Sequence, residues 1–412
     1  MWKTVKLKDV CSVFTDGDWI ETKDQSAEGI RLVQTGNVKT GSFADRKDKA
    51  RYISNETFAR LNCTEVMEGD ILVSRLPEPV GRACVIPKLQ EKAITAVDCT
   101  VIRTKEEVLP TYLNYYMQSP QYFSLVQEKV TGATRQRISR KNLGEVLVSI
   151  PPLAEQQRIV AKLDAAFAEI DKKTQTALEK IENAYSFERN ILDAALSGID
   201  TTKHSYTLQQ LLDMGWIVSH LDGNHGSDYP RKNEFIDKGV PYISANCVID
   251  GNVVMSKAKY LSADRAAQLR KGIARNGDVL FAHNATVGPT AILQTSEEKV
   301  ILGTSLTYFR CNDETISNEY LLAFMRSRQF IKQYNEVMRQ ATRNQVPITK
   351  QRTFTFLIPE IDVQHKVAKT VGTLSELTAE IVRATDASKK QLNALKAAIL
   401  ARELQPPYSE AA

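Results

Sequence analysis

The sequence predicts an α+β fold in which two pseudo-repeated α/β domains are joined by two long antiparallel coiled-coil helices. Three observations lead to this prediction. The chain repeats itself at a distance of about 208 residues, each repeat opens with short apolar runs typical of strands, and each closes with a long apolar stripe at helical spacing. With 412 residues, of which 42% are hydrophobic and 25% charged, the chain is long enough for two or three cores.

The internal repeat is visible as motifs that recur in the same order. Residues 49–54 (KARYIS) return as KAKYLS 208 positions later, and residues 69–72 (GDIL) return as GDVL at the same spacing. Residues 110–137 share nine of 28 positions with the segment 208 positions further on. Ordinary composition would give about two such identities. The chain is therefore predicted to be a duplication.

Each repeat begins with a globular part that mixes strands and helices. In the first copy, β-rich runs at 71–74 and 99–103 follow turn or charged residues and predict strands, and apolar residues at helical spacing predict a helix over 111–126. Residues 1–150 and 198–358 are therefore predicted to form the two α/β domains.

Two proline-free stretches predict the long helices, within segments 151–197 and 359–405, followed by a tail at 406–412. The 44 residues from 153 to 196 contain no Gly or Pro and correspond to roughly 66 Å of helix. Because a whole domain separates the helices in sequence, antiparallel packing fits best; packing of each helix on its own domain is the alternative. The predicted seam contains Leu163, Phe167, Ile170, Thr174, Ala177, Ile181, Ala184 and Ile191, and then Val367, Val371, Leu374, Thr378, Ile381, Leu392, Leu395 and Ile399.

Composition and spacing exclude several classes of protein. No apolar run approaches the roughly 18 residues of a membrane span, and the N-terminus lacks the apolar stretch of a signal peptide, so we expect a cytoplasmic protein with no membrane partner. The six cysteines form no C-x-x-C pair and the five histidines show no paired metal spacing. No disulfide framework, metal site or cofactor is predicted.

No catalytic motif is found. Residues 36–42 have the glycine spacing of a phosphate loop but lack the lysine that binds the β/γ-phosphates, which favours an ordinary turn. Residues 151–153 (PPL) lack both the preceding Asn or Asp and the following aromatic residue with which an adenine methyltransferase holds a flipped base. We therefore predict that the chain is not an enzyme.

Two loops carry polar groups suited to DNA. Residues 131–137 (TGATRQR) and 340–345 (QATRNQ) combine hydroxyl, guanidinium and amide groups, which suit phosphate anchoring and the reading of guanine and adenine edges. A Thr-Arg pair could equally cap a turn and pair with an acid, but Ala-Thr-Arg persists in both copies. The candidates are Thr134, Arg135 and Arg137 in the first copy and Thr342, Arg343 and Asn344 in the second.

Further polar candidates lie near predicted strand ends and differ between the copies. Arg75 aligns with His283, and Gln34 with Ser244. Two domains with a shared scaffold and different side chains would recognise two different sequences, although each residue taken singly also fits a solvated surface position. The first copy contributes Gln34, Thr35, Asn37, Arg75 and Arg82, and the second contributes Ser244, Asn246, His283 and Asn284.

The positive charge lies in the globular parts. Of the net +5, residues 1–150 contribute +3 and 198–358 contribute +4, while 151–197 carry −2 and 359–412 carry 0. This distribution is expected if the domains bind a polyanion and the helices bind protein.

At residues 150–160 (IPPLAEQQRIV) and 131–138 (TGATRQRI), the chain resembles the specificity subunits of Type I restriction-modification systems, and the resemblance covers nearly its full length. The first string is typical of the opening of that family's spacer helix. In the second copy, Glu360, His365 and Lys366 replace Pro152, Gln157 and Arg158, and Gln340 replaces Gly132.

The resemblance implies a non-catalytic DNA reader with two target recognition domains, each reading half of a split, asymmetric double-stranded DNA target. It implies that two methyltransferase (modification) subunits bind the spacer helices and methylate adenine with S-adenosylmethionine. Restriction subunits would join through the complex and cleave DNA with ATP and Mg²⁺. The alternatives are a coiled-coil adaptor with two protein-binding domains and no DNA recognition, and, third, a nuclease fused to recognition domains.

Overall fold

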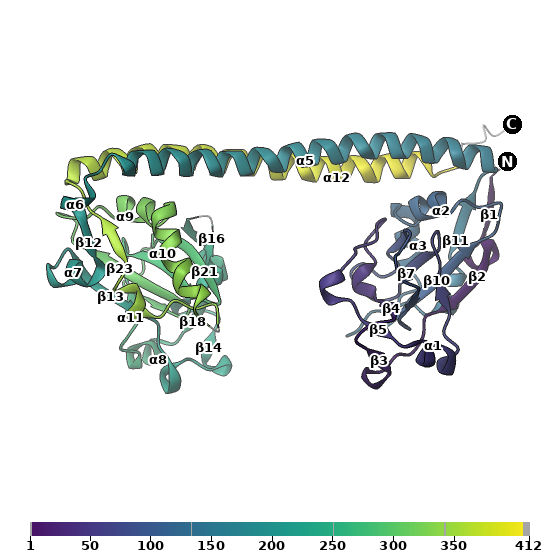
Figure 1. Ribbon diagram of the computed structural model, residues 1–412, viewed down its shortest axis with the longest axis horizontal. Helices are drawn as coiled ribbons and strands as arrows, with labels where there is room; N and C mark the ends of the chain where they lie inside the picture. Colours follow the sequence, from purple (N-terminus) through teal and green to yellow (C-terminus); the bar gives the residue numbers. More distant parts are fainter. Residues whose placement is uncertain (1, 133, 250, 342, 407–412) are drawn as a thin grey trace. The chain divides into compact units, whose positions relative to one another are not determined.

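The computed structural model describes residues 2–132, 134–249, 251–341 and 343–406 (Figure 1). The chain divides into two compact units. Unit 1 holds the residues up to 177 together with those from 386 onward, and unit 2 holds residues 178–385. Each unit therefore contains one globular part and portions of both long helices.

The globular part of unit 1 is built on two main sheets. The first has the order β2-β10-β7-β8 and is antiparallel, and the second has the order β3-β5-β4-β9-β6 with one parallel pair, β4 and β9. A small third sheet pairs the first strand, β1, with the last, β11. The strands are β1 (Lys3–Lys6), β2 (Cys11–Asp16), β3 (Gln25–Ser26), β4 (Ile30–Val33), β5 (Tyr52–Ile53), β6 (Glu65–Val66), β7 (Ile71–Ser74), β8 (Ala83–Val85), β9 (Ala93–Thr95), β10 (Cys99–Thr104) and β11 (Leu147–Ile150).

Four short helices accompany these strands among the described residues of unit 1: α1 (Asn55–Leu61), α2 (Pro110–Tyr116), α3 (Pro120–Gln127) and α4 (Arg140–Gly144). Polar caps set where several of them begin, because Ser54, Ser119 and Ser139 each accept a hydrogen bond from the backbone two or three residues into the helix. Helix α2 contributes Tyr112, Leu113 and Tyr116 to the main core of the unit, which also contains Leu163 of the first long helix.

Unit 2 repeats the same strand orders. Its sheets are β13-β23-β20-β21, β14-β18-β15-β22-β19 and β12-β24, and a hairpin β16-β17 is added. The strands are β12 (Ser205–Thr207), β13 (Ile217–Asp222), β14 (Phe235–Ile236), β15 (Val240–Ile243), β16 (Val248–Ile249), β17 (Asn252–Val253), β18 (Lys259–Leu261), β19 (Ile273–Ala274), β20 (Val279–Asn284), β21 (Thr286–Ile292), β22 (Val300–Leu302), β23 (Leu306–Cys311) and β24 (Thr355–Leu357). The helices are α6 (Thr201–His204), α7 (Leu208–Asp213), α8 (Ala263–Gln268), α9 (Asn318–Phe324), α10 (Arg328–Arg339) and α11 (Ile348–Gln351).

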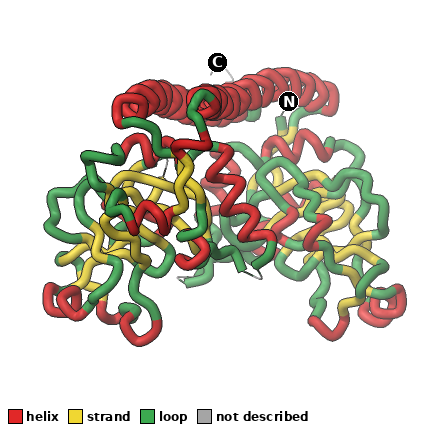
Figure 2. The backbone as a smooth tube through the Cα atoms, turned by 60° about the vertical axis from the view of Figure 1, so that its left-hand side comes forward, coloured by secondary structure: helices red, strands yellow, loops and turns green. Residues whose placement is uncertain are grey.

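In both units the strands lie inside and are surrounded by loops and short helices (Figure 2). The matching strand orders confirm the predicted pair of repeated α/β domains. The six cysteines are free thiols, and five of the six are buried.

A buried glutamine fixes each junction between globular part and long helix. The Gln156 side chain accepts a hydrogen bond from the Leu109 N–H at 2.8 Å and donates to the carbonyls of Glu107 at 2.8 Å and Pro151 at 2.9 Å. Gln364, 208 positions later, makes the same three hydrogen bonds in unit 2. Both side chains are fully buried, so all of their hydrogen-bonding groups must be satisfied within the protein.

The long helices α5 (Leu153–Ser197) and α12 (Ile361–Glu403) run antiparallel within each unit. In unit 1, Lys162 pairs with Glu403 at 2.9 Å and Asp171 pairs with Lys396 at 2.5 Å, so residue numbers rise along one helix as they fall along the other. In unit 2, Leu192 and Leu196 share a core with Val367 and Val371. The prediction of antiparallel helices is confirmed.

The predicted seam holds along α5 as far as Ala184, but at Ile191 the neighbouring Leu192 is the more buried residue, and the seam is wrong at two positions of α12. Ile381 and Leu395 are exposed, whereas their neighbours Val382 and Lys396 are more buried. Thr378 and Thr385 are buried seven residues apart, and after Thr378 the next seam position is Val382, four residues on, rather than Ile381. Ile381 and Leu395 were predicted to be buried because they are apolar, but the rotation of the helix at these positions places both side chains outward.

Among the described residues, the structure contains no helix with the length and apolar content to cross a membrane.

Candidate nucleic-acid interface

One end of the sheets in unit 1 is formed by loops that are hydrogen-bonded to one another. The β9–β10 connection lies at the centre: the Thr95 carbonyl accepts from the Asp18 N–H at 2.8 Å, and the Asp98 carbonyl accepts from the Arg75 N–H at 2.9 Å. The Ala96 N–H donates to the end of β4, at Val33, at 3.0 Å. We call this surface loop face 1; it consists of residues 17–19, 34–37, 75–82 and 95–98 together with residues 131–132 and 134–138 of the following loop.

The 131–138 loop joins loop face 1 through its last residue. The Ile138 N–H donates to the Arg75 carbonyl at 3.2 Å. Thr131 and Arg137 exchange two backbone hydrogen bonds of 2.9 Å that close the loop. The predicted contact residues Thr134, Arg135 and Arg137 are all exposed, so their side chains reach solvent at the rim of the face.

Unit 2 builds an equivalent surface, loop face 2, from residues 223–229, 244–247, 283–286, 303–305, 340–341 and 343–346. The Val346 N–H donates to the His283 carbonyl at 2.8 Å, 208 positions after the equivalent bond of loop face 1. The His283 N–H donates to the Ser305 carbonyl at 3.0 Å. The loop is held further by the Ala285 N–H, which donates to the Asn344 carbonyl at 2.9 Å. Both exposed candidates of this loop, Arg343 and Asn344, therefore sit on a scaffold that matches the first copy.

One candidate, Thr342, lies outside the described residues. The other candidates of loop face 2 are placed at its surface: Asn246 is exposed, and Ser244 and Asn284 are half-buried. Asn284 pairs with Gln345 in an isolated bridge, and the Ser244 hydroxyl donates to the Asn246 Oδ1 at 2.8 Å.

Arg82 and Asn37, predicted as DNA contacts, turn inward. The Arg82 guanidinium is 8% exposed and donates to four backbone carbonyls at 2.6–3.1 Å, those of Val38, Leu76, Pro79 and Thr35. The Asn37 side chain accepts from the Gln34 N–H at 3.0 Å and donates to the Ala44 carbonyl at 2.8 Å. The Arg82 guanidinium and the Asn37 amide are thus satisfied by loop backbone and hold the 34–38 segment in place, which does not support the predicted DNA contacts.

Arg75 and His283 occupy equivalent positions in the two units, and the side chain of each contacts the backbone of a neighbouring loop. The buried Arg75 side chain donates to the Val97 carbonyl at 2.5 Å, and its Nε lies 3.4 Å from Asp16 Oδ1. His283 is 1% exposed, and its Nδ1 lies 3.0 Å from the Val346 carbonyl. Burial lowers the pKa of His283, so the ring is neutral and its Nδ1–H donates to that carbonyl. Both side chains are enclosed in this structure, which does not support the predicted direct contact with DNA.

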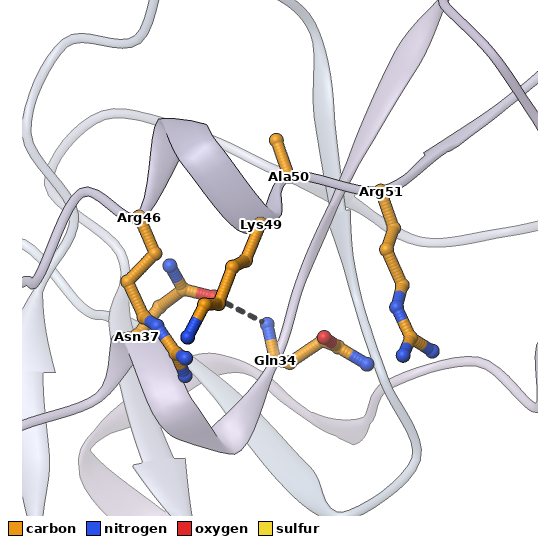
Figure 3. A pocket seen from close by; sticks show the side chains of 6 residues that line it. All are labelled: Gln34, Asn37, Arg46, Lys49, Ala50 and Arg51. Atoms are coloured by element: carbon orange, nitrogen blue, oxygen red, sulfur yellow. Dashed lines mark hydrogen bonds between the residues drawn. The ribbon is translucent and has the colours of Figure 1, made fainter. Parts of the chain in front are cut away.

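A basic hollow of about 470 Å³ opens on loop face 1 (Figure 3). Gln34 and Asn37 line it together with Arg46, Lys49, Ala50 and Arg51. Arg46, Lys49 and Arg51 are exposed cations, and the described lining residues include no carboxylate. An anion entering the hollow is therefore attracted by three positive charges, whereas the Gln34 amide offers a donor and an acceptor.

Of the residues that line this hollow, the sequence analysis selected Gln34 and Asn37 as candidate contact residues but did not select the three cations. The segment 46–51 (RKDKAR) is rich in basic residues, and that charge run is the signal that could have found them. Gly36 matters at this point because a Cβ there would lie 2.3 Å from Arg46 Nη1, so the absence of a side chain makes room for the guanidinium.

The equivalent place in unit 2 is less basic. Val254, Lys257 and Lys259 stand where unit 1 has Arg46, Lys49 and Arg51. The Lys259 ammonium lies 4.7 Å from the centre of the Phe235 ring, which draws it toward the protein surface. The two loop faces thus share their backbone construction and differ in the side chains they present.

The fold and the two loop faces define a protein with two recognition units on one duplicated scaffold. The chain matches the family described as "Type I restriction modification DNA specificity domain" over residues 1–183 and again over 218–390. The chain belongs to this family, as its sequence motifs predicted. Specificity subunits of Type I restriction-modification systems are non-catalytic, and no cofactor of its own is evident for this chain.

Curated relatives carry the same description. The Type I restriction enzyme EcoBI specificity subunit of Escherichia coli is 21% identical over 304 residues, which cover 70% of this chain and 64% of that protein. The EcoKI specificity subunit of Escherichia coli strain K12 is 27% identical over 183 residues, 42% of this chain and 38% of that protein. The matches with these relatives therefore span less than two thirds of their lengths.

A solved structure shows the same fold. A chain from "Structural basis underlying complex assembly and conformational transition of the type I R-M system" superimposes with a TM-score of 0.67 at 17% identity, covering 98% of this chain and 97% of that chain. This likeness confirms the predicted architecture of two repeated domains and two long helices.

Proposed function

We propose that this protein is the DNA-reading subunit of a Type I restriction-modification complex, and that it recognises a bipartite, asymmetric double-stranded DNA target. Loop face 1 reads one half of the target and loop face 2 reads the other. The observation that carries the proposal is that two equivalent loop faces, tied together by the same backbone hydrogen bonds, present different side chains. Two readers of this kind suit two different half-sites.

The exposed side chains divide into two chemical roles. Arg135, Arg137 and the cations of the basic hollow suit phosphate anchoring or bidentate contact with guanine. Gln34 and Asn344 suit the donor and acceptor pair of adenine. Arg75, Arg82, Asn37 and His283 support these groups from within, as positioning residues.

We further propose that two modification subunits bind α5 and α12, and that restriction subunits join through the complex. Apolar side chains exposed on both helices support this part of the proposal, because surfaces that bind protein are rich in such residues. They are Leu153, Leu178, Tyr185, Phe187, Val363, Leu377, Ile381 and Leu395. S-adenosylmethionine, ATP and Mg²⁺ would be used by those partner subunits, and the assembly would act in the cytoplasm, where its DNA target lies.

Binding to DNA at graded salt tests the proposal. The full chain, co-purified with its modification subunits, is mixed with a random-sequence duplex library, and the retained duplexes are sequenced. A DNA reader should select two short sequence blocks and lose affinity steeply between 50 and 200 mM salt, as roughly six to ten phosphate contacts predict. A coiled-coil adaptor would select no sequence and show no such loss of affinity.

A further inference from the structure

We infer that Trp19 in unit 1 and Tyr229 in unit 2 are equivalent DNA-contacting residues whose rings pack against base and deoxyribose atoms of the two half-sites. The inference rests on the proposed function and names side chains that the sequence analysis did not select. It concerns one exposed aromatic residue at the same point of each loop face.

The equivalence of the two positions follows from the turns on either side of them. A Cβ at Gly17 would lie 2.4 Å from the Ala96 carbonyl oxygen, and a Cβ at Gly223 would lie 2.2 Å from that of Gly303, so both loops begin with the same close approach to the neighbouring connection. Both loops then end at the N-cap of a 3₁₀ turn that leads into a short strand.

The aromatic residues stand two positions before those caps. Trp19 precedes Glu21, the N-cap of the first turn, and Tyr229 precedes Arg231, the N-cap of the second. The second loop is four residues longer between its glycine and its cap, and yet it places an aromatic ring at the same distance from the cap.

Both rings are exposed to a degree that needs an explanation. Trp19 is 70% exposed and Tyr229 is 46% exposed, and Trp19 has the largest exposed fraction among the large hydrophobic side chains of the described residues. Large aromatic side chains left in water are characteristic of surfaces that bind a partner.

Polar contacts hold each ring at the surface. The pKa of Glu21 is lowered by hydrogen bonding to Lys23, by the charge of Lys23 and by hydrogen bonding to Trp19. The hydrogen bond between Trp19 and Glu21 ties the indole to the following turn. The pKa of Tyr242, a residue of β15, is raised by burial and by the nearby Tyr229 hydroxyl, which is hydrogen-bonded to it. The Tyr229 ring therefore lies beside β15. Neither ring belongs to a described hydrophobic core cluster.

Both rings lie at the loop faces. The Asp18 N–H donates to the Thr95 carbonyl at 2.8 Å, which fixes the residue before Trp19 on the central connection of loop face 1. Tyr242, the hydrogen-bonding neighbour of Tyr229, lies two residues before Ser244, the position equivalent to Gln34. An uncharged ring at the rim of a basic face contributes contact with sugars and bases that phosphate anchoring cannot supply.

The full chain with its modification subunits tests the inference. The probe is a duplex selected by that wild-type complex from the random library. Trp19→Ala and Tyr229→Ala should each weaken binding on the order of tenfold without changing the salt dependence, because no phosphate contact is removed. Trp19→Phe and Tyr229→Phe should retain most of the affinity because a ring remains.

Matched controls are available in both units. Met67 and Met214 are exposed apolar residues that precede β7 and β13, whereas the loop faces follow those strands. Met67→Ala and Met214→Ala should bind as the wild type does, and these variants and those at Trp19 should keep the wild-type thermal unfolding midpoint because the changed side chains are exposed.

The outcomes separate the two proposals. If the wild-type complex selects duplexes but both alanine variants match its affinity and its selected sequences, the inference about the rings is overturned and the proposed function stands. If the wild-type complex selects no duplex, both are overturned. Repeating the selection with each alanine variant should relax sequence preference in one block only, a different block for each.

Discussion

Replacing Arg82 by alanine tests whether the buried arginines of the loop faces position the reading groups or contact DNA. The Arg82 guanidinium donates four hydrogen bonds of 2.6–3.1 Å to backbone carbonyls on both the 34–38 segment and the 76–79 segment. A hydrogen bond from a charged donor contributes about 1.5–3 kcal/mol. The four contributions are not additive, since the freed carbonyls move together and regain water. We expect Arg82→Ala to cost about 3–5 kcal/mol, the usual cost of disrupting a buried charged network.

The cost is best measured locally, within unit 1. Hydrogen exchange of the backbone N–H groups in residues 34–38, followed in the full chain, should speed up by the factor that corresponds to about 3–5 kcal/mol, on the order of 10²–10³ or more. Arg137→Ala, which removes an exposed arginine from the same face, should leave that exchange unchanged.

DNA binding by Arg82→Ala distinguishes the two roles. A positioning residue should weaken recognition of one half-site and leave the slope of affinity against salt unchanged, since no phosphate contact disappears. The reasoning is refuted if the variant keeps wild-type exchange rates and lowers the salt slope by about one, because that combination is the signature of a phosphate contact.

Four further predictions follow from the charges and helices. Arg135→Ala and Arg343→Ala should each weaken DNA binding by about 1–3 kcal/mol in one half-site; equal binding and discrimination by both variants would make these loops structural. Burial lowers the pKa of His220 to about 4, below the roughly 6.5 of an unfolded histidine, so protonation in acid favours the unfolded state. The free energy of unfolding of unit 2 should therefore fall by up to about 3 kcal/mol as the pH falls from about 6.5 to 4. His220→Phe should remove this loss in urea titrations at graded pH. Four residues inserted near Thr174, adding about 6 Å of helix, should move the recognised half-sites apart by one or two base pairs or prevent assembly, as library selection would show. The highly purified chain alone should neither methylate nor cleave DNA, and methyl transfer by it in a labelled S-adenosylmethionine assay would contradict the non-catalytic assignment.

Unit 1 provides the internal control for the pH prediction. All five histidines of the chain lie in unit 2. His220 faces Gln351, whose Oε1 lies 3.1 Å from its Nε2, and the Phe309 ring, whose centre lies 4.5 Å away, with His283, Arg352 and Asp222 as the other nearby titratable or charged groups. Acid in the same range should therefore destabilise unit 2 more than unit 1.

The repeat and the long helices could be predicted because they depend on local pattern. A stretch of 44 residues without Gly or Pro and with apolar residues at helical spacing specifies a helix whatever surrounds it. The exact seam could not be predicted in the same way. Ile381 and Leu395 are apolar and stand at a permitted spacing, and only the packing against α5 decides that Val382 and Lys396 turn inward instead.

The direction in which the candidate DNA-contacting side chains point could not be predicted from the sequence. Arg75 and Arg82 follow strand β7, at the end of the sheet that forms loop face 1. Whether a guanidinium turns outward depends on how many backbone carbonyls the folded loops leave unsatisfied near it, and that number exists only in three dimensions. The sequence did not indicate Arg46, Lys49 and Arg51 because these residues line a hollow together with Gln34 only in the folded chain.

The two copies separate the residues that maintain the fold from those that present chemistry. Asp70 binds Arg103 through two hydrogen bonds, and the pair Asp278 and Arg310 repeats this contact in unit 2, as Gln364 repeats Gln156. These repeated contacts are buried or half-buried and lie outside the loop faces, whereas most exposed residues of the faces differ between the copies, with Arg135 and Arg343 as a shared exception. A substitution at an exposed face position removes no part of the repeated framework and costs little stability. If the protein reads a bipartite target as proposed, each half-site could therefore change by mutation of one loop face while the other face and the helices remain intact.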